Sequence, residues 1–253
     1  MTASVFDSPM FTKLYPVGDA GRLFTHSAEI RAALLVLGTL AKVQTERSEI
    51  PEDSAFFIHR SAMEVQIDPA GLADGIAQDG SYIPALVAAF DKAMEAPEHS
   101  KYILHNANPQ DVADTALMLR LRQLLTQADT ALKTLPDSDS RTALLADLPM
   151  IRDTCLRVAF TTAPEIGIAI GEALKLGPPQ DTRAPIRTIA NLLTLAGDTA
   201  ANSAPVSPAN AALRAQLLGL NALFQDTSDA ASEALYLPQI ALSSLSLLNM
   251  ATA

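Results

Sequence analysis

The sequence predicts an all-α protein, and three features of its composition indicate this class. Hydrophobic residues make up 49% of the 253 residues, whereas aromatic residues account for only 5%. Ala and Leu, which are strong helix formers, dominate the apolar positions. Glycine is scarce, at 11 residues, and the alternation of β-branched residues that is typical of strands is rare. A chain of this length supports one large domain or two smaller ones.

The first part of the chain predicts an irregular lead and then several modest helices. Residues 1–26 contain proline and glycine breakers and form the lead. Ser27 is a suitable N-cap for a helix with apolar residues at helical spacing. The next expected elements are a helix opened by Pro51, a short helix from Asp68-Pro69, a helix over 84–94 and a polar loop over 97–109.

The second part predicts a bundle of long helices. The longest uninterrupted helical pattern extends from Gln110 to Leu135. The later helices are expected over 139–150, 153–175, 184–200, 208–225 and 229–250, separated by Pro149, Gly177-Pro178-Pro179, 204–208 and Asp226. We therefore predict an N-terminal helical region over 1–100 and a helical bundle over 101–253.

Charge and cysteine usage limit the partners and the compartment. The formal net charge is −10 and no basic stripe is present, so we expect no nucleic-acid partner. Cys155 is the only cysteine, which excludes an internal disulfide. The first residues lack the apolar run of a signal peptide. The apolar stretch 235–251 is short for a membrane span and contains a proline, so we expect a buried or interface helix and a cytoplasmic protein without a membrane partner.

No cofactor or metal is expected from the motifs. The four histidines show no metal-ligand spacing, and neither a Gly-rich phosphate loop nor a nucleophile elbow is present. The polar segment 104–111 precedes the longest helix. Asn108 or Asp111 can cap that helix, or its free N–H groups can attract an anion; the sequence leaves both interpretations open.

The segment Lys101–Arg122 resembles the first signature region of the fumarase/aspartase superfamily, and in particular its 3-carboxy-cis,cis-muconate cycloisomerase branch. The family pattern is retained at Lys101, Tyr102, Ala107, Gln110, Asp111, Asp114, Thr115, Leu117, Leu119, Leu121 and Arg122. The N-terminal part is also similar to the family, at 5–9, 30–41, 49–51 and 80–84, so the resemblance covers 1–135. Residues 150–162 and 201–211 faintly resemble the second and third signature regions.

This sequence departs from the family pattern at several chemical positions. In the first region, the family His falls on Leu104, and the family Thr-Ser pair falls on Asn108 and Pro109. In the second region, the family His falls on Cys155 and the family Gln falls on Arg157. In the third region, the family Ser falls on Asn202 and the family Lys falls on Pro208. Cys155 is then interpreted as a small buried hydrophobe, and Asp111 and Asp114 as charges of the helix N-terminus. Arg152 and Arg157 are candidate replacement cations.

The resemblance implies a long-helix bundle of the fumarase/aspartase type, shortened here, and a homo-oligomer (a tetramer in the family) without a cofactor. It implies intramolecular addition of a carboxylate across a double bond of a small polycarboxylate, as in aromatic-compound degradation by the β-ketoadipate pathway. A one-residue shift makes His105 and Ser203 the candidate catalytic residues. Asn108, Gln110, Arg157 and Asn210 are the candidate substrate-binding residues. The alternative is an inactive relative that binds a small anion or serves as an oligomer partner, so enzymatic activity stays open.

Overall fold

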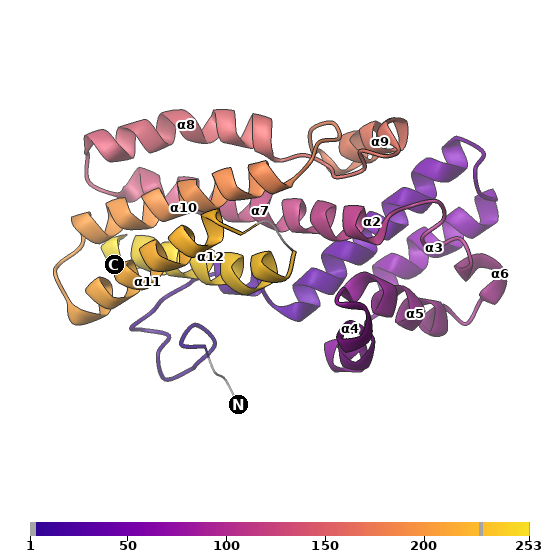
Figure 1. The fold of residues 1–253 in the computed structure, drawn as a ribbon, viewed down its shortest axis with the longest axis horizontal. Helices are drawn as coiled ribbons and strands as arrows, with labels where there is room; N and C mark the ends of the chain where they lie inside the picture. Colours follow the sequence, from indigo (N-terminus) through magenta and orange to yellow (C-terminus); the bar gives the residue numbers. More distant parts are fainter. Residues whose placement is uncertain (1–3, 228–229, 253) are drawn as a thin grey trace. The chain divides into compact units, whose positions relative to one another are not determined.

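The computed structural model describes residues 4–227 and 230–252, in which helices are the only regular elements apart from one isolated β-bridge (Figure 1). The predicted all-α class is confirmed. The described residues form two compact units that are interleaved in sequence. Unit 1 takes in the described parts of 1–24 and 183–253 together with 121–155, and unit 2 takes in 25–120 and 156–182. The predicted division after residue 100 is a different partition and stays a prediction.

The centre of unit 2 is α2 (His26–Glu46), which packs against α3 (Glu52–Glu64). Thr25, rather than the expected Ser27, caps α2, because its hydroxyl oxygen accepts the amide of Ala28 at 3.2 Å. The apolar residues of α2 are buried along most of its length, which fits a central helix. The other elements of unit 2 are η1 (Pro69–Leu72), α4 (Ala73–Asp79), α5 (Tyr82–Met94), α6 (Pro97–Ser100), the first part of α7 (Pro109–Thr134) and α9 (Pro164–Leu174).

An extended segment precedes α9, so the helix expected over 153–175 is wrong for its first half. Leu156, Val158 and Phe160 are all buried and alternate along this segment, which is the period of a strand. The amide of Val158 donates to the Gly177 carbonyl at 3.2 Å, and the Gly177 amide donates to the Leu156 carbonyl at 2.8 Å. This pairing with a distant residue holds the backbone extended until Pro164 starts α9.

Unit 1 is a bundle whose helices are the last part of α7, α8 (Asp139–Cys155), α10 (Arg183–Ser203), α11 (Pro208–Gln225) and α12 (Ala230–Thr252), together with the short α1 (Ala20–Leu23). Figure 1 shows α10, α11 and α12 side by side, in agreement with their extensive mutual packing. The predicted start of the last helix at residue 229 lies outside the described residues, as do residues 1–3 of the predicted lead.

Pro149 lies inside α8, so the break expected there is wrong. An internal proline costs roughly 3 kcal/mol, because it removes one helical hydrogen bond and crowds the preceding turn. Leu144, Leu148, Ile151 and Cys155 are all buried at helical spacing on both sides of the proline. Burial of this stripe, at about 1.5 to 3 kcal/mol for each large apolar side chain, exceeds the cost of the proline.

The apolar stretch of α12 is a buried helix, as the sequence predicts. Residues 233–252 are long and apolar enough to cross a membrane by length and composition, and 56% of the most apolar window is buried within the protein. The helix packs against α10 and α11. Gly197 of α10 lets the backbones of α10 and α12 approach closely. A Cβ atom added at Gly197 would lie 2.9 Å from Cα of Ser244.

Candidate functional site

The candidate loop 104–108 leads directly into α7 in unit 2, and His105 lies within it. The His105 Nε2 atom is 3.1 Å from the side-chain amide nitrogen of Asn106, and its ring makes an edge contact with Tyr102 at a centroid distance of 5.8 Å. The side-chain amide of Gln44 donates to the His105 carbonyl. Asn106 adopts a left-handed conformation, with φ of 49°, which asparagine tolerates better than most residues. The loop is therefore fixed to α2 through its backbone.

Two of the predicted substrate-binding residues stabilise the start of α7. The Oδ1 atom of Asn108 accepts the backbone amide of Gln110 at 2.9 Å, so of the two capping residues that the sequence leaves open, Asn108 satisfies a free N–H group at this end. The side-chain amide of Gln110 donates to Asp114 Oδ1 at 2.7 Å. Because Asn108 is exposed, its amide nitrogen remains available as a donor to a ligand.

Asp111 is the most unusual group at this end of the helix. Only 9% of its surface is exposed, and its Oδ2 atom is buried without a hydrogen-bond partner. Burial, with the nearby Asp114 carboxylate as a second cause, raises the pKa of Asp111 from 3.8 to about 6. A carboxyl that titrates near neutral pH is a candidate proton donor or acceptor. From the sequence, Asp111 is interpreted as a charge of the helix N-terminus rather than as a catalytic acid; two aspartates three residues apart on one helix are the available signal for the second role.

Asp114 and Thr115 connect α7 to the segment 156–182. The Thr182 hydroxyl donates to Asp114 Oδ2 at 2.9 Å, and the Thr115 hydroxyl oxygen accepts the Ala159 amide at 3.1 Å. All four of these groups are buried. The two retained family positions therefore fix the extended segment to the helix.

A buried ion pair and a tyrosine lie near the same carboxylates. Arg120 is 8% exposed and its Nη2 atom lies 3.0 Å from Glu29 Oε1. The Tyr82 hydroxyl is buried and has no hydrogen-bond partner. Burial, and after it the Glu29 carboxylate, raises the pKa of Tyr82, so the phenol stays protonated at neutral pH. Asp114 also acts on Tyr82, which places both in one buried polar cluster of unit 2.

The second signature region is divided between the two units. Arg157 is half-buried on the extended segment of unit 2. Cys155 ends α8 in unit 1, is 6% exposed, and lies 3.7 Å from the Thr154 hydroxyl, which fits a small buried side chain. Arg152, the other candidate cation, donates to the Leu125 carbonyl at 2.8 Å within unit 1.

The third region lies in unit 1, where Ser203 and Asn210 make structural hydrogen bonds. The Ser203 hydroxyl donates to the Thr199 carbonyl of its own helix at 2.9 Å. Asn210 is 4% exposed, and its side-chain amide donates to the Ala201 carbonyl at 3.2 Å, which ties α11 to α10. Thus His105, Asn108, Gln110 and Arg157 belong to one unit, and Ser203 and Asn210 to the other.

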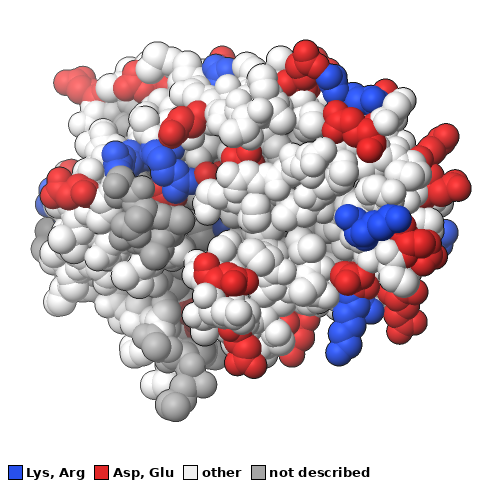
Figure 2. Space-filling view, turned by 45° about the vertical axis from the view of Figure 1, so that its right-hand side comes forward, with Lys and Arg blue, Asp and Glu red and all other residues white. Residues whose placement is uncertain are grey.

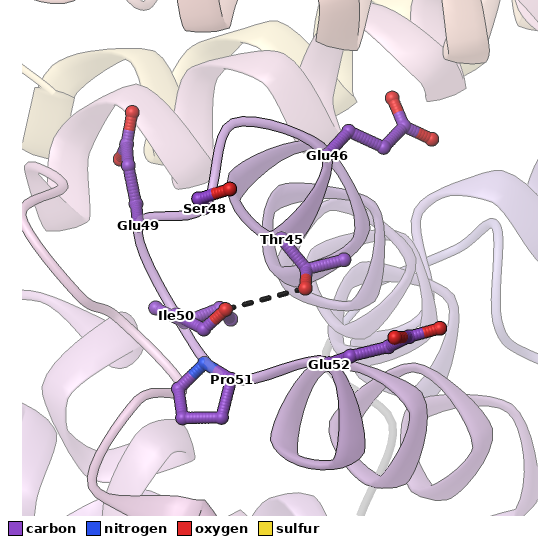
Figure 3. Close-up of a pocket in the computed structure, with 7 residues that line it drawn as sticks. All are labelled: Thr45, Glu46, Ser48, Glu49, Ile50, Pro51 and Glu52. Atoms are coloured by element: carbon purple, nitrogen blue, oxygen red, sulfur yellow. Dashed lines mark hydrogen bonds between the residues drawn. The ribbon is translucent and has the colours of Figure 1, made fainter.

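Two hollows of the described part of the chain, one in each unit, contain none of the candidate site residues. In unit 2 a hollow of about 550 Å³ sits at the turn between α2 and α3 and is lined by Thr45, Glu46, Ser48, Glu49, Ile50, Pro51 and Glu52 (Figure 3). The Thr45 hydroxyl closes this turn by donating to the Ile50 carbonyl at 3.2 Å. Figure 3 shows the three glutamates pointing in different directions, which does not suit one shared ligand.

Charged side chains mark no further site among the described residues on the face drawn in Figure 2. Among the described residues, no group of three or more His, Cys, Asp or Glu side chains is arranged to hold a metal ion. On the face drawn in Figure 2, the Lys and Arg side chains are scattered among Asp and Glu and form no continuous basic stripe. This pattern agrees with the net charge of −10.

Comparison with known proteins connects the fold to one superfamily. No family model matches the chain. A 3-carboxy-cis,cis-muconate cycloisomerase from Pseudomonas putida is 29% identical over 194 residues, which are 71% of this chain and 44% of the relative. An N-acetyl-S-(2-succino)cysteine lyase from Enterococcus italicus is 25% identical over 122 residues, which are 48% of this chain and 26% of the relative. The chain therefore spans less than half the length of these curated relatives.

Solved structures show the same fold. A 3-carboxy-cis,cis-muconate lactonizing enzyme from Pseudomonas putida matches with a TM-score of 0.84 and 19% identity, covering 97% of this chain and 76% of that one. A fumarate lyase from Mesorhizobium matches with a TM-score of 0.77 and 18% identity, covering 92% and 73%. The chain thus has a fold of the fumarase/aspartase type, and its sequence is similar to that of a 3-carboxy-cis,cis-muconate cycloisomerase.

The similarity to the fumarase/aspartase superfamily divides the first signature region into a helical half and a loop half. The helical half of the first signature region, 110–122, keeps the family pattern and supplies Asp114 and Thr115, which hold the fold together. The loop half, 104–109, differs from the family and carries His105 and Asn108. Polar groups of this loop take part in local hydrogen bonds that hold the backbone. The structure therefore gives more direct support to the family fold than to a reaction at this loop.

Proposed function

We propose that this superfamily member is a cycloisomerase or lyase that acts on a small polycarboxylate by adding a carboxylate across a double bond. The sequence similarity to the muconate cycloisomerase supports the reaction class. The structural observation that carries the proposal is Asp111, a buried carboxyl with a pKa of about 6 beside the loop of His105 and Asn108. The reaction exchanges a proton at a carbon next to a carboxylate, and a group that titrates near neutral pH is suited to this exchange.

The proposed roles follow from the chemistry of each side chain. His105 exchanges the substrate proton, and Asp111 holds the exchangeable proton at the base of the loop. Asn108 and Gln110 shape the anion-binding end of α7, where Asn108 keeps an amide donor. Arg157 supplies a cation for a substrate carboxylate. Ser203 and Asn210 stay candidates from the sequence alone, and their hydrogen bonds lie within unit 1. The proposal requires no cofactor, because the carboxylate of the substrate is itself the nucleophile.

We include a homo-oligomer in the proposal. The supporting feature is the surface of α11, where Ala211, Ala215, Leu218 and Ala222 are exposed at helical spacing. Arg214 is the only charged residue of this helix, so the stripe is an uncharged apolar surface. Such stripes favour association with another helix. A cytoplasmic location is part of the same proposal and rests on the sequence.

The test follows the ultraviolet absorbance of 3-carboxy-cis,cis-muconate, whose conjugated diene is lost when a lactone forms. The wild-type chain is expected to accelerate this loss. His105→Gln and Asp111→Asn are each expected to lower kcat/KM by about 10²-fold or more, the usual contribution of a general acid or base. The matched controls His26→Gln and Asp147→Asn change exposed residues and should keep wild-type rates.

Absence of turnover above buffer at high protein concentration would reject the enzymatic proposal and favour the inactive relative. Equal loss of activity in the control variants would instead indicate unfolding. Far-ultraviolet circular dichroism of every variant separates these two outcomes, because an all-α chain loses its helical signal when it unfolds.

A further inference from the structure

The hollow of unit 1 is lined by three segments: the last part of α7, the end of α12 and residues 17–19. Its volume is about 520 Å³, and none of the candidate site residues lines it. The side-chain amide of Asn249 on α12 donates to the Pro16 carbonyl at 3.0 Å. Gly18 takes a left-handed conformation, with φ of 56°, which glycine adopts without strain. A hydrogen bond to α12 therefore holds the third wall of the hollow.

Threonines line the helical walls of this hollow. The hydroxyls of Thr126, Thr130 and Thr134 donate to carbonyls of their own helix at 3.0, 3.0 and 2.7 Å. Thr252 on α12 donates in the same way to the Leu248 carbonyl at 3.2 Å. A hydroxyl whose hydrogen is used in this way keeps only its lone pairs for a ligand. These threonines therefore offer hydrogen-bond acceptors and no donors.

Asp19 is the one charged side chain among the described residues that line the hollow. Its Oδ1 atom lies 3.5 Å from Nη1 of Arg22, and the two side chains are 77% and 86% exposed. Such an exposed pair contributes little, so another cation can replace the guanidinium. The remaining lining includes Val17, Ala131 and the buried Leu245, which are apolar.

We propose that this hollow binds a primary ammonium group carried on a short apolar chain, as in an alkylamine or a diamine. An ammonium group has three hydrogen-bond donors and no acceptor, which complements the threonine oxygens and the Asp19 carboxylate. The methylene groups of the chain suit the apolar part of the lining. A divalent metal ion is a poorer match, because it requires several oxygen ligands and the described residues hold no group of three acidic, His or Cys side chains. The site does not depend on the proposed reaction.

The test is a titration with 1,4-diaminobutane, followed by the methyl resonances of the isotope-labelled full chain. The net charge of −10 attracts any cation, so the titration is run at physiological ionic strength, which screens charges beyond about 8 Å. The methyl resonances of Val17, Ala131 and Leu245 are expected to shift and to saturate. The uncharged analogue 1,4-butanediol has the same length and should cause no saturable shift.

Matched variants separate the hollow from the general charge of the protein. Asp19→Asn is expected to weaken the affinity for the diamine about threefold or more, and Thr130→Val about twofold. Arg22→Gln should tighten binding about twofold, because it removes the competing cation. Asp147→Asn changes an exposed acid of α8, and Arg60→Gln changes an exposed arginine that pairs with a glutamate in unit 2. These two controls should leave the affinity unchanged.

Shifts that saturate and that weaken in Asp19→Asn support the site, whether or not the chain turns over muconate. Equal effects of Asp19→Asn and Asp147→Asn overturn it, because the net charge then accounts for the attraction. A response that rises without saturation also overturns it. Equal binding of the diol overturns the ammonium class. Circular dichroism confirms the fold of each variant, and Arg22→Gln tests the site with the Asp19 carboxylate intact.

Discussion

Replacing Asp111 by asparagine should stabilise the protein at neutral pH and leave its stability at acid pH nearly unchanged. The folded pKa is raised, from 3.8 to about 6, so ionisation of this carboxyl opposes folding. The difference of about two pKa units corresponds to roughly 3 kcal/mol, since each unit is worth about 1.4 kcal/mol. Asparagine keeps the shape of the protonated acid and removes this penalty.

The raised pKa determines how the stability of the wild type changes with pH. Below pH 3.8 the carboxyl is protonated in both the folded and unfolded states, and it contributes no penalty. Between 3.8 and about 6 the unfolded chain has released its proton while the folded chain still holds it, so the stability of the wild type falls as pH rises. Above about 6 the penalty is complete. The advantage of Asp111→Asn should therefore grow across this interval and then level off.

Urea unfolding followed by circular dichroism, at pH values from about 4 to 8, measures this difference. Asp147→Asn is the control, because Asp147 is an exposed acid on α8 and should show little pH-dependent effect. A stability difference between Asp111→Asn and wild type that does not change with pH would refute the reasoning. So would a net loss of stability at pH 7. If Asp111→Asn gains stability and loses activity, Asp111 is a site residue that lowers the stability of the folded protein.

Four further predictions concern packing and buried hydrogen bonds. Ser243→Ala should leave stability unchanged or raise it by about 1 kcal/mol, because the buried Ser243 hydroxyl has no partner. Ser244→Ala should lower stability by about 1 kcal/mol in the same urea assay, because its hydroxyl donates to a carbonyl of α10. Gly197→Ala should lower stability by about 1 to 3 kcal/mol, and the midpoint of thermal unfolding checks this, since the new Cβ would lie 2.5 Å from a leucine of α11. Thr115→Val should speed amide exchange of residues 156–160, whereas Thr115→Ser should not, because only serine retains the acceptor for the Ala159 amide.

Helical periodicity was enough to locate most of the fold. The long pattern over 110–135 corresponds to α7, and those over 184–200 and 208–225 correspond to α10 and α11. These helices carry their own signals, namely apolar spacing and breakers at both ends. The errors at Pro149 and over 153–175 have another origin. A buried stripe keeps α8 intact through the proline, and pairing with Gly177 keeps residues 156–160 extended. Both causes lie in distant contacts that no local pattern contains.

The candidate site residues stay a prediction, because the same residue types also serve local structure. Asn108 and Gln110 have the donors that a carboxylate needs, yet one caps α7 and the other holds Asp114. Asn210 is a buried bridge between two helices. Residue type alone cannot separate a ligand contact from a cap or a bridge, since the hydrogen-bonding groups are identical. The choice requires the partner of each atom, which only the folded chain supplies.

Two opposing effects act on the Asp111 carboxyl, and their sizes decide whether its pKa is lowered or raised. Its place in the first turn of α7 predicts stabilisation of the ionised carboxylate by the helix dipole, worth about 0.3 to 1 kcal/mol. Burial and the neighbouring Asp114 act in the opposite direction and raise the pKa by about two units, or roughly 3 kcal/mol. The second effect is larger, so the carboxyl holds its proton up to about pH 6. An interpretation as a helix N-terminal charge accounts for the position of Asp111 in the first turn of α7 but not for its raised pKa. The buried oxygen without a partner is the observation that reverses it.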